Sequence, residues 1–157
     1  MKTTSRVAAL LAFVLAFAVP AVAATFTTGN YKGKTAQTYR KHHHKKHRKI
    51  SVHADSTAGQ VSNLKFFTQG KCSDGGRSSG KQGPFTTSVD QNGHFSVSGT
   101  SPSGATHLKL NGTLSGNKAN GTVKVVSHFN KNNQPDPNGK IRCSSGKVKW
   151  SAKRVGS

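Results

Sequence analysis

The residues with the clearest chemistry form one basic segment, from Tyr39 to Lys49, which reads YRKHHHKKHRK. It holds six lysine or arginine side chains and four histidines, and no acidic residue. A run of like charges repels itself and resists burial, so we expect a mobile, extended loop between the first and second strands. Cations at this density bind polyanions and release their counterions. The candidate anion ligands of this segment are Arg40, Lys41, Lys45, Lys46, Arg48 and Lys49.

We expect no cofactor. The histidines of the same segment nevertheless support a second interpretation, in which they bind a divalent transition metal weakly. Neutral imidazole is a good ligand for copper, nickel or zinc. The surrounding cations repel a divalent ion, and the spacing is not that of a closed four-ligand zinc site. A third interpretation is a solvated insertion with no specific partner. The candidate metal ligands are His42, His43, His44 and His47.

Catalytic patterns are weak along the whole chain. The acidic residues are four scattered aspartates, Asp55, Asp74, Asp90 and Asp136, which make a facing pair for acid–base work on sugars a poor prospect. No G-x-S-x-G nucleophile elbow is present. The segment from Gly29 to Thr35 has one residue too few between its glycines for a nucleotide-binding phosphate loop. We therefore expect a protein without enzymatic activity.

The N-terminus has the pattern of a cleaved secretory signal peptide over residues 1–23. Lys2 and Arg6 precede an apolar run, and Ala21-Val22-Ala23 follows it as a cleavage site. The apolar run is too short to cross a bilayer. We expect a secreted protein with no transmembrane segment after cleavage, formed by one domain over residues 24–157.

The charge and the cysteines fit such a domain. The chain carries a formal charge of +20, and removal of Lys2 and Arg6 with the leader leaves +18. An excess of this size favours polyanionic partners. Cys72 and Cys143 are the two cysteines, and in an exported protein they are expected to form one disulfide. A bridge across this separation restricts the unfolded chain by roughly 4 kcal/mol. We expect a monomer.

Short runs of alternating apolar and polar residues predict an all-β fold, an antiparallel barrel or sandwich of about eight short strands. The sequence Asp90-Gln91-Asn92-Gly93 between two such runs predicts a hairpin turn. If the apolar residues of the later strands point inward, the lysines between them point outward. Lys109, Lys124 and Lys149 would then extend an anion-binding surface over the domain.

Several segments resemble small secreted bacterial all-β proteins of unassigned function. These are the Gly-x-Tyr-x-Gly-Lys-Thr start at 29–35 and the Cys-x-Ser-Gly-x-Val-x-Trp-Ser-Ala end at 143–152. The resemblance implies an exported β domain with a bridging cysteine pair, and it brings no binding residues. A fainter similarity to lipocalin-like or avidin-like barrels is non-specific and carries no ligand by itself. A second candidate function is small-molecule binding inside the barrel, with Tyr31, Trp150 and the phenylalanines lining a cavity.

The partner expected from these residues is an anionic polymer or surface, such as a cell-wall polymer, extracellular DNA or an acidic polysaccharide. Electrostatic attraction could then hold the secreted protein at the cell wall. Motifs that read nucleic-acid sequence are lacking. Small-molecule binding in the barrel and metal binding at the histidines remain the alternatives.

Overall fold

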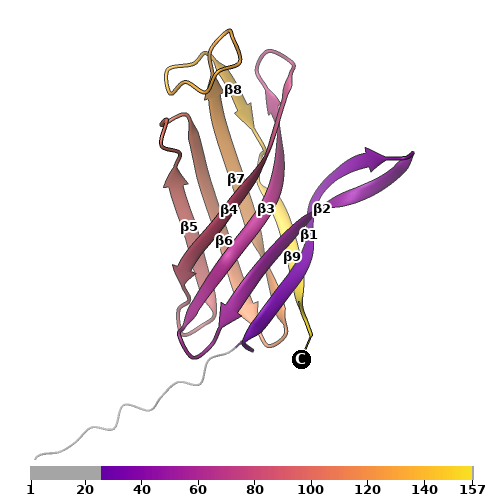
Figure 1. Ribbon diagram of the computed structural model, residues 1–157, viewed down its shortest axis with the longest axis vertical. Helices are drawn as coiled ribbons and strands as arrows, with labels where there is room; N and C mark the ends of the chain where they lie inside the picture. Colours follow the sequence, from indigo (N-terminus) through magenta and orange to yellow (C-terminus); the bar gives the residue numbers. More distant parts are fainter. Residues whose placement is uncertain (1–25, 157) are drawn as a thin grey trace, which may run out of the picture.

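The computed structural model describes residues 26–156, and these form an all-β domain in which no helix occurs (Figure 1). The predicted signal peptide lies outside the described residues. The strands are β1 (Gly29–Lys41), β2 (His44–Asp55), β3 (Gln60–Cys72), β4 (Arg77–Ser88), β5 (His94–Thr100), β6 (Thr106–Ser115), β7 (Lys118–Phe129), β8 (Ile141–Ser144) and β9 (Val148–Val155).

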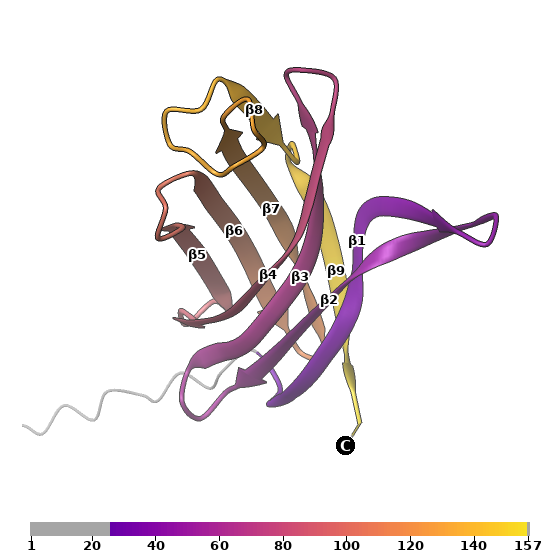
Figure 2. The same ribbon diagram turned by 45° about the horizontal axis from the view of Figure 1, so that its top comes forward.

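The strands pair antiparallel throughout and close a six-stranded ring. This confirms the all-β antiparallel fold and shows that it is the barrel, of the two alternatives expected from the sequence. Around the ring, β1 pairs with β2, β2 with β3, β3 with β8, β8 with β7, β7 with β9, and β9 with β1. Further strands extend it: β4 adds to β3, while β6 and then β5 add to β7. The curl of these strands is visible in Figure 2.

The inner faces of β1 to β7 and of β9 meet in one hydrophobic core. The predicted alternation of buried and outward residues is confirmed in β6, in β9 and in β2 from Ile50 onward. Val52 and Leu64 come from one side of the barrel and Leu110 and Trp150 from the other, and all four belong to the same cluster. The outward residues between them are therefore free to carry charge.

Gly112 makes room for the Phe95 ring inside the barrel, and Gly121 lets β7 lie close to the backbone of β6. Phe95 lies directly opposite Gly112, Gly112 opposite Gly121, and Gly121 opposite Trp150, in one row across four strands. A Cβ atom on Gly112 would lie 2.2 Å from the Phe95 ring. The Phe95 ring therefore occupies the space beside Gly112, and its centroid lies 6.2 Å from that of the Trp150 ring.

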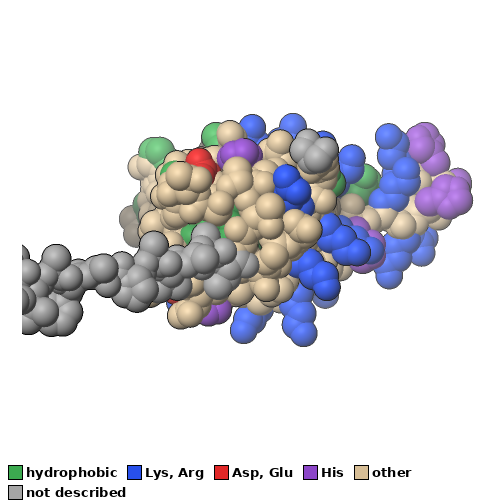
Figure 3. Space-filling view, turned by 90° about the horizontal axis from the view of Figure 1, so that it is seen from below, with side chains coloured by type: hydrophobic (Ala, Val, Ile, Leu, Met, Phe, Trp, Pro, Cys, Tyr) green, Lys and Arg blue, Asp and Glu red, His purple; other side chains and the backbone are tan. Residues whose placement is uncertain are grey.

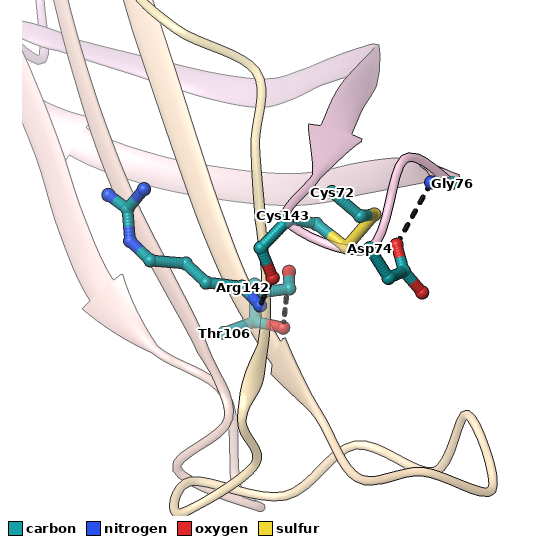
Figure 4. The surroundings of a disulfide bond; sticks show 8 residues. Cys72, Asp74, Gly76, Thr106, Arg142 and Cys143 are labelled. Carbon is teal, nitrogen blue, oxygen red and sulfur yellow. Dashed lines mark hydrogen bonds between the residues drawn. A yellow bond between two sulfur atoms is a disulfide. The ribbon is translucent and has the colours of Figure 1, made fainter.

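The disulfide joins Cys72 of β3 to Cys143 of β8, as expected (Figure 4). The two cysteines lie opposite each other in the ladder that closes the ring, and Lys71 with Ser144 is the other pair of that ladder. Ser73 Oγ accepts a hydrogen bond from the amide of Arg142 beside it. The bridge therefore covalently fixes a closure that rests on a very short strand pairing.

The structure contains the turn predicted at Asp90, but the two strands on either side of it do not pair with each other as a hairpin. The turn forms, and Asp90 Oδ1 accepts hydrogen bonds from the amides of Asn92 and His94. However, β4 pairs with β3 and β5 pairs with β6, so the two strands stand at opposite ends of the sheet order. The contact between them includes a hydrogen bond from Thr87 Oγ1 to the Ser96 carbonyl. An Asn-Gly turn fixes the local reversal, whereas strand pairing depends on the more distant neighbours.

Candidate functional site

The basic segment forms a two-stranded arm that projects from the barrel. β1 pairs with β9 only as far as Thr35, and β2 pairs with β3 only from Ile50 onward. Between these points the two strands pair with each other, from Thr38 opposite His47 to Lys41 opposite His44. We call residues 38–47 the arm; Figures 1 and 2 show it standing away from the barrel.

The arm reverses at a two-residue turn formed by His42 and His43. Both residues have positive φ values, 48° and 64°. Two-residue hairpin turns with this backbone match the right-handed twist of the paired strands and usually contain asparagine and glycine. The segment expected to be a loop is therefore mostly β-structure, and only its tip is a turn. The prediction gave the charge repulsion too much weight relative to backbone pairing.

Gln37 ties the base of the arm to the barrel. Its side-chain Nε2 donates to the carbonyl oxygen of Gln69 at 2.5 Å, and its Oε1 accepts from the Gln69 amide at 2.9 Å. At Gln69, β3 no longer has β2 as a neighbouring strand, because β2 has left the barrel for the arm. The amide side chain of Gln37 makes the hydrogen bonds that a neighbouring strand would make. This contact occupies backbone groups that would otherwise lack a partner in the sheet.

Arg48 attaches the arm to the barrel a second time through aromatic rings. Its guanidinium carbon lies 4.3 Å from the ring centroid of Tyr39 and 4.0 Å from that of Phe67. Both distances fall within the range of cation–π attraction. The buried Nε of Arg48 has no hydrogen-bond partner. Arg48, which the sequence assigned to anion binding, therefore also has a structural role.

The remaining cations of the arm are exposed on both of its faces. Directly opposed residues of an antiparallel pair share a face. Lys41, His44 and Lys46 accordingly lie on one face, and Arg40, Lys45 and His47 on the other. Figure 3 shows lysine and arginine side chains on both sides of the arm and histidines at its tip. An anion can thus approach from either side.

Like charges also face each other across neighbouring strands of the barrel. Lys34 lies opposite Lys49, and Lys109 lies opposite Lys124. Lys153 has a lysine on each side, Lys32 on β1 and Lys118 on β7. Like charges directly opposite each other destabilise a sheet. The arrangement therefore costs stability, which an anion bound over it would restore.

The aspartates hold turns and are not placed to neutralise this charge. Each carboxylate accepts hydrogen bonds from backbone amides two to four residues later in its own turn. Asp55 receives them from Thr57 and Ala58, Asp74 from Gly76, Asp90 from Asn92 and His94, and Asp136 from Asn138. The positive surface is consequently left to solvent and to partners.

The outward lysines expected from the sequence are exposed. Lys109, Lys124 and Lys149 all lie on outer faces, with buried neighbours on either side in sequence. The prediction missed the lysines of the lower barrel, which strand pairing gathers. Their alternation with interior residues, as in Lys32-x-Lys34, shows that they face outward but not which strands lie beside them. These residues are Lys32, Lys34, Lys65, Lys81, Lys118 and Lys153.

The histidines proposed as metal ligands are divided among different parts of the arm. His42 and His43 form the turn, whereas His44 and His47 lie on opposite faces. His47 Nδ1 lies 2.9 Å from the carbonyl oxygen of Thr35. Within residues 26–156, no group of three histidine, cysteine or acidic side chains is placed to hold a metal ion.

Tyr31 and Trp150, the proposed cavity-lining residues, belong to the packed core. Their exposed fractions are 0% and 3%. The Tyr31 hydroxyl is directed at the carbonyl oxygens of Thr27 and Gly116, at 2.6 and 2.8 Å. Burial raises the pKa of this phenol, and the positive charge of Arg154 partly opposes that rise. The phenol thereby fastens the lower end of β1 to the turn between β6 and β7.

Comparison with known proteins places the chain in no family: no family model, curated protein or solved structure matches it. Among the described residues, no helix is long and apolar enough to span a membrane.

Proposed function

We propose that this chain is a secreted, non-catalytic protein that attaches electrostatically to an anionic polymer, with the arm as its principal contact. The candidate polymers are a cell-wall polymer, extracellular DNA and an acidic polysaccharide. The observation that carries the proposal is the projecting arm itself, whose exposed cations have no acidic neighbour in the arm sequence.

The chemistry of the arm supports this function. Lysine and arginine side chains neutralise anionic groups and release condensed counterions, so affinity depends steeply on salt. The arm is held at its base by Gln37 and Arg48, which limits the conformational freedom lost on binding. The formal charge of +18 on residues 24–157 adds long-range attraction.

Elution from a column of an immobilised anionic polymer tests the proposal. The arm variant carries Lys41→Gln, Lys45→Gln and Lys46→Gln, which remove charge and leave the Arg48 stack intact. We expect it to elute at distinctly lower salt than the unmodified chain from residue 24.

The matched control removes the same charge at the far end of the barrel. The end variant carries Lys131→Gln, Lys140→Gln and Arg142→Gln in exposed residues in or beside the β7–β8 connection. We expect this variant to elute close to the unmodified chain. Equal elution of the two variants would mean that net charge alone governs retention, and the arm would have no special role.

A further inference from the structure

The lower barrel carries a second concentration of charge, made only of lysines. Two hollows in the surface share Lys32 and Gly33. Lys34, Lys118 and Lys153 line one of them, and Lys49, Lys65 and Lys81 line the other, together with Phe67. We call these seven lysines the belt; they lie on β4, β3, β2, β1, β9 and β7, which are consecutive in the sheet.

The pairing register makes the belt continuous. Lys118, Lys153 and Lys32 lie opposite one another on three neighbouring strands. Lys32 in turn lies opposite Ser51, and Ser51 lies opposite Lys65. At ~4.8 Å per strand, the path from β4 to β7 measures roughly 24 Å around the barrel. Side chains of one charge thus follow a curved surface, across the strands.

The belt also adjoins the arm. Phe67, which lines one hollow, stacks on the guanidinium of Arg48 at the base of the arm. Lys49 links the two by sequence, because it follows Arg48 and lines the same hollow. A polymer held by the arm can therefore continue onto the belt.

We propose that the belt binds a flexible, single-stranded polyanion that wraps part of the barrel, with its charges on phosphodiester groups. This inference rests on the proposed function of the arm and adds the kind of polymer. The curvature of the belt supports the first part of the proposal, the flexibility of the polymer. Duplex DNA has a persistence length of ~150 base pairs and resists bending around so narrow a body, so a duplex touches the arm without following the belt.

The side-chain type of the belt supports the second part of the proposal, the phosphodiester groups of the polymer. A lysine ammonium acts as a point charge and binds phosphate oxygens without fixing their orientation, whereas the arginine fork holds carboxylate and phosphate alike in a fixed bidentate geometry. All seven cations of the belt are lysines. Arg154, close by on β9, directs its Nε at the carbonyl oxygen of Thr28 instead. The belt is therefore suited to a flexible chain whose phosphodiester groups pass over it in no fixed orientation.

The test compares affinities for a single-stranded thymidine 20-mer and for a 20-base-pair duplex. The belt variant carries Lys32→Gln, Lys118→Gln and Lys153→Gln, and the end variant again supplies the control of equal charge. Loss of three contacts to a single strand flattens the salt slope by ~2, which corresponds to ~50-fold weaker binding at 0.15 M salt. We expect this loss for the single strand only, with duplex affinity equal to that of the end variant.

The outcomes separate this inference from the proposed function. If the arm variant loses affinity and the belt variant matches the end variant, the arm function stands and the belt inference is overturned. Equal losses for single strand and duplex would overturn the flexible-chain requirement. If no variant differs from the end variant, both proposals fail.

Two further polymers test the phosphodiester chemistry and its source. A poly(glycerol phosphate) chain stands for a cell-wall source, and the thymidine 20-mer for a nucleic-acid source. We expect both to bind in a belt-dependent manner, and the tighter one identifies the source. Polygalacturonate of the same charge should bind more weakly, and equal affinity for it would overturn the phosphodiester assignment.

Discussion

The Arg48 guanidinium carbon lies 4.0 Å from the centroid of the Phe67 ring, and this contact joins the arm to the outer surface of β3. Arg48 belongs to β2, which no longer pairs with β3 at this point. The stack therefore continues the β2–β3 association with side chains after the backbone ladder has ended.

Arg48→Lys should loosen the arm, because it keeps the charge and removes the planar group that stacks between Tyr39 and Phe67. Cation–π contacts are worth about 0.5–2 kcal/mol, so the amides of the arm should exchange with solvent several-fold faster. Hydrogen exchange measures this directly. Arg40→Lys, at an exposed position on the arm, is the matched control. The same exchange rates in both variants would contradict a structural role for Arg48.

Gln37→Glu should destabilise the domain by about 1–3 kcal/mol. The carboxylate can still accept from the Gln69 amide but cannot donate to its carbonyl oxygen, so a backbone acceptor loses its partner. Urea unfolding measures the change. Gln91→Glu adds the same charge at an exposed position in the β4–β5 turn and should have little effect. A loss of stability that is no greater for Gln37→Glu would show that Gln37 does not anchor the arm.

We predict that ionisation of the Tyr31 phenol lowers the stability of the folded chain at alkaline pH. Its folded-state pKa is raised above the unfolded value, chiefly by burial. The folded chain therefore holds the phenolic proton more tightly, and this stabilisation is complete below about pH 10 and disappears as the pH rises through the folded-state pKa. Thermal unfolding above pH 10 should show a smaller decline for Tyr31→Phe than for Tyr39→Phe. Equal declines would contradict the assignment.

Lys153→Gln should stabilise the protein at low salt. Lys153 faces lysines on both neighbouring strands, and relief of opposed like charges is worth about 0.2–1 kcal/mol. The gain should shrink at 1 M salt, where the Debye length falls to ~3 Å. Melting temperatures at both salt concentrations measure it. Lys131→Gln, in the β7–β8 connection, controls for net charge, and an equal gain there would argue against local repulsion.

The sequence was sufficient to predict the fold class, because alternation in strands such as Leu108–Leu110 and Val148–Trp150 reports burial directly. It also predicted the disulfide, since two cysteines allow one pairing. The pairing register could not be predicted, because nothing in the sequence shows that Phe95 lies opposite Gly112, where the missing side chain makes room for its ring.

The candidate site was predictable only in its composition. The charge of residues 39–49 was evident from the sequence. The arm, however, forms because β1 and β2 extend beyond the residues at which they pair with β9 and β3. Phe67 had no sequence signal that would associate it with Arg48. The belt depends on pairs such as Lys32 with Lys153, which lie at opposite ends of the chain.

The most direct test of the account is the salt dependence of binding to the thymidine 20-mer, measured for the unmodified chain, the arm variant and the end variant. Loss of three arm contacts should flatten the slope of log K against log salt by ~2. We predict this change for the arm variant, while the end variant keeps the slope of the unmodified chain. Identical slopes for the two variants would contradict the claim that the arm is the principal anion contact.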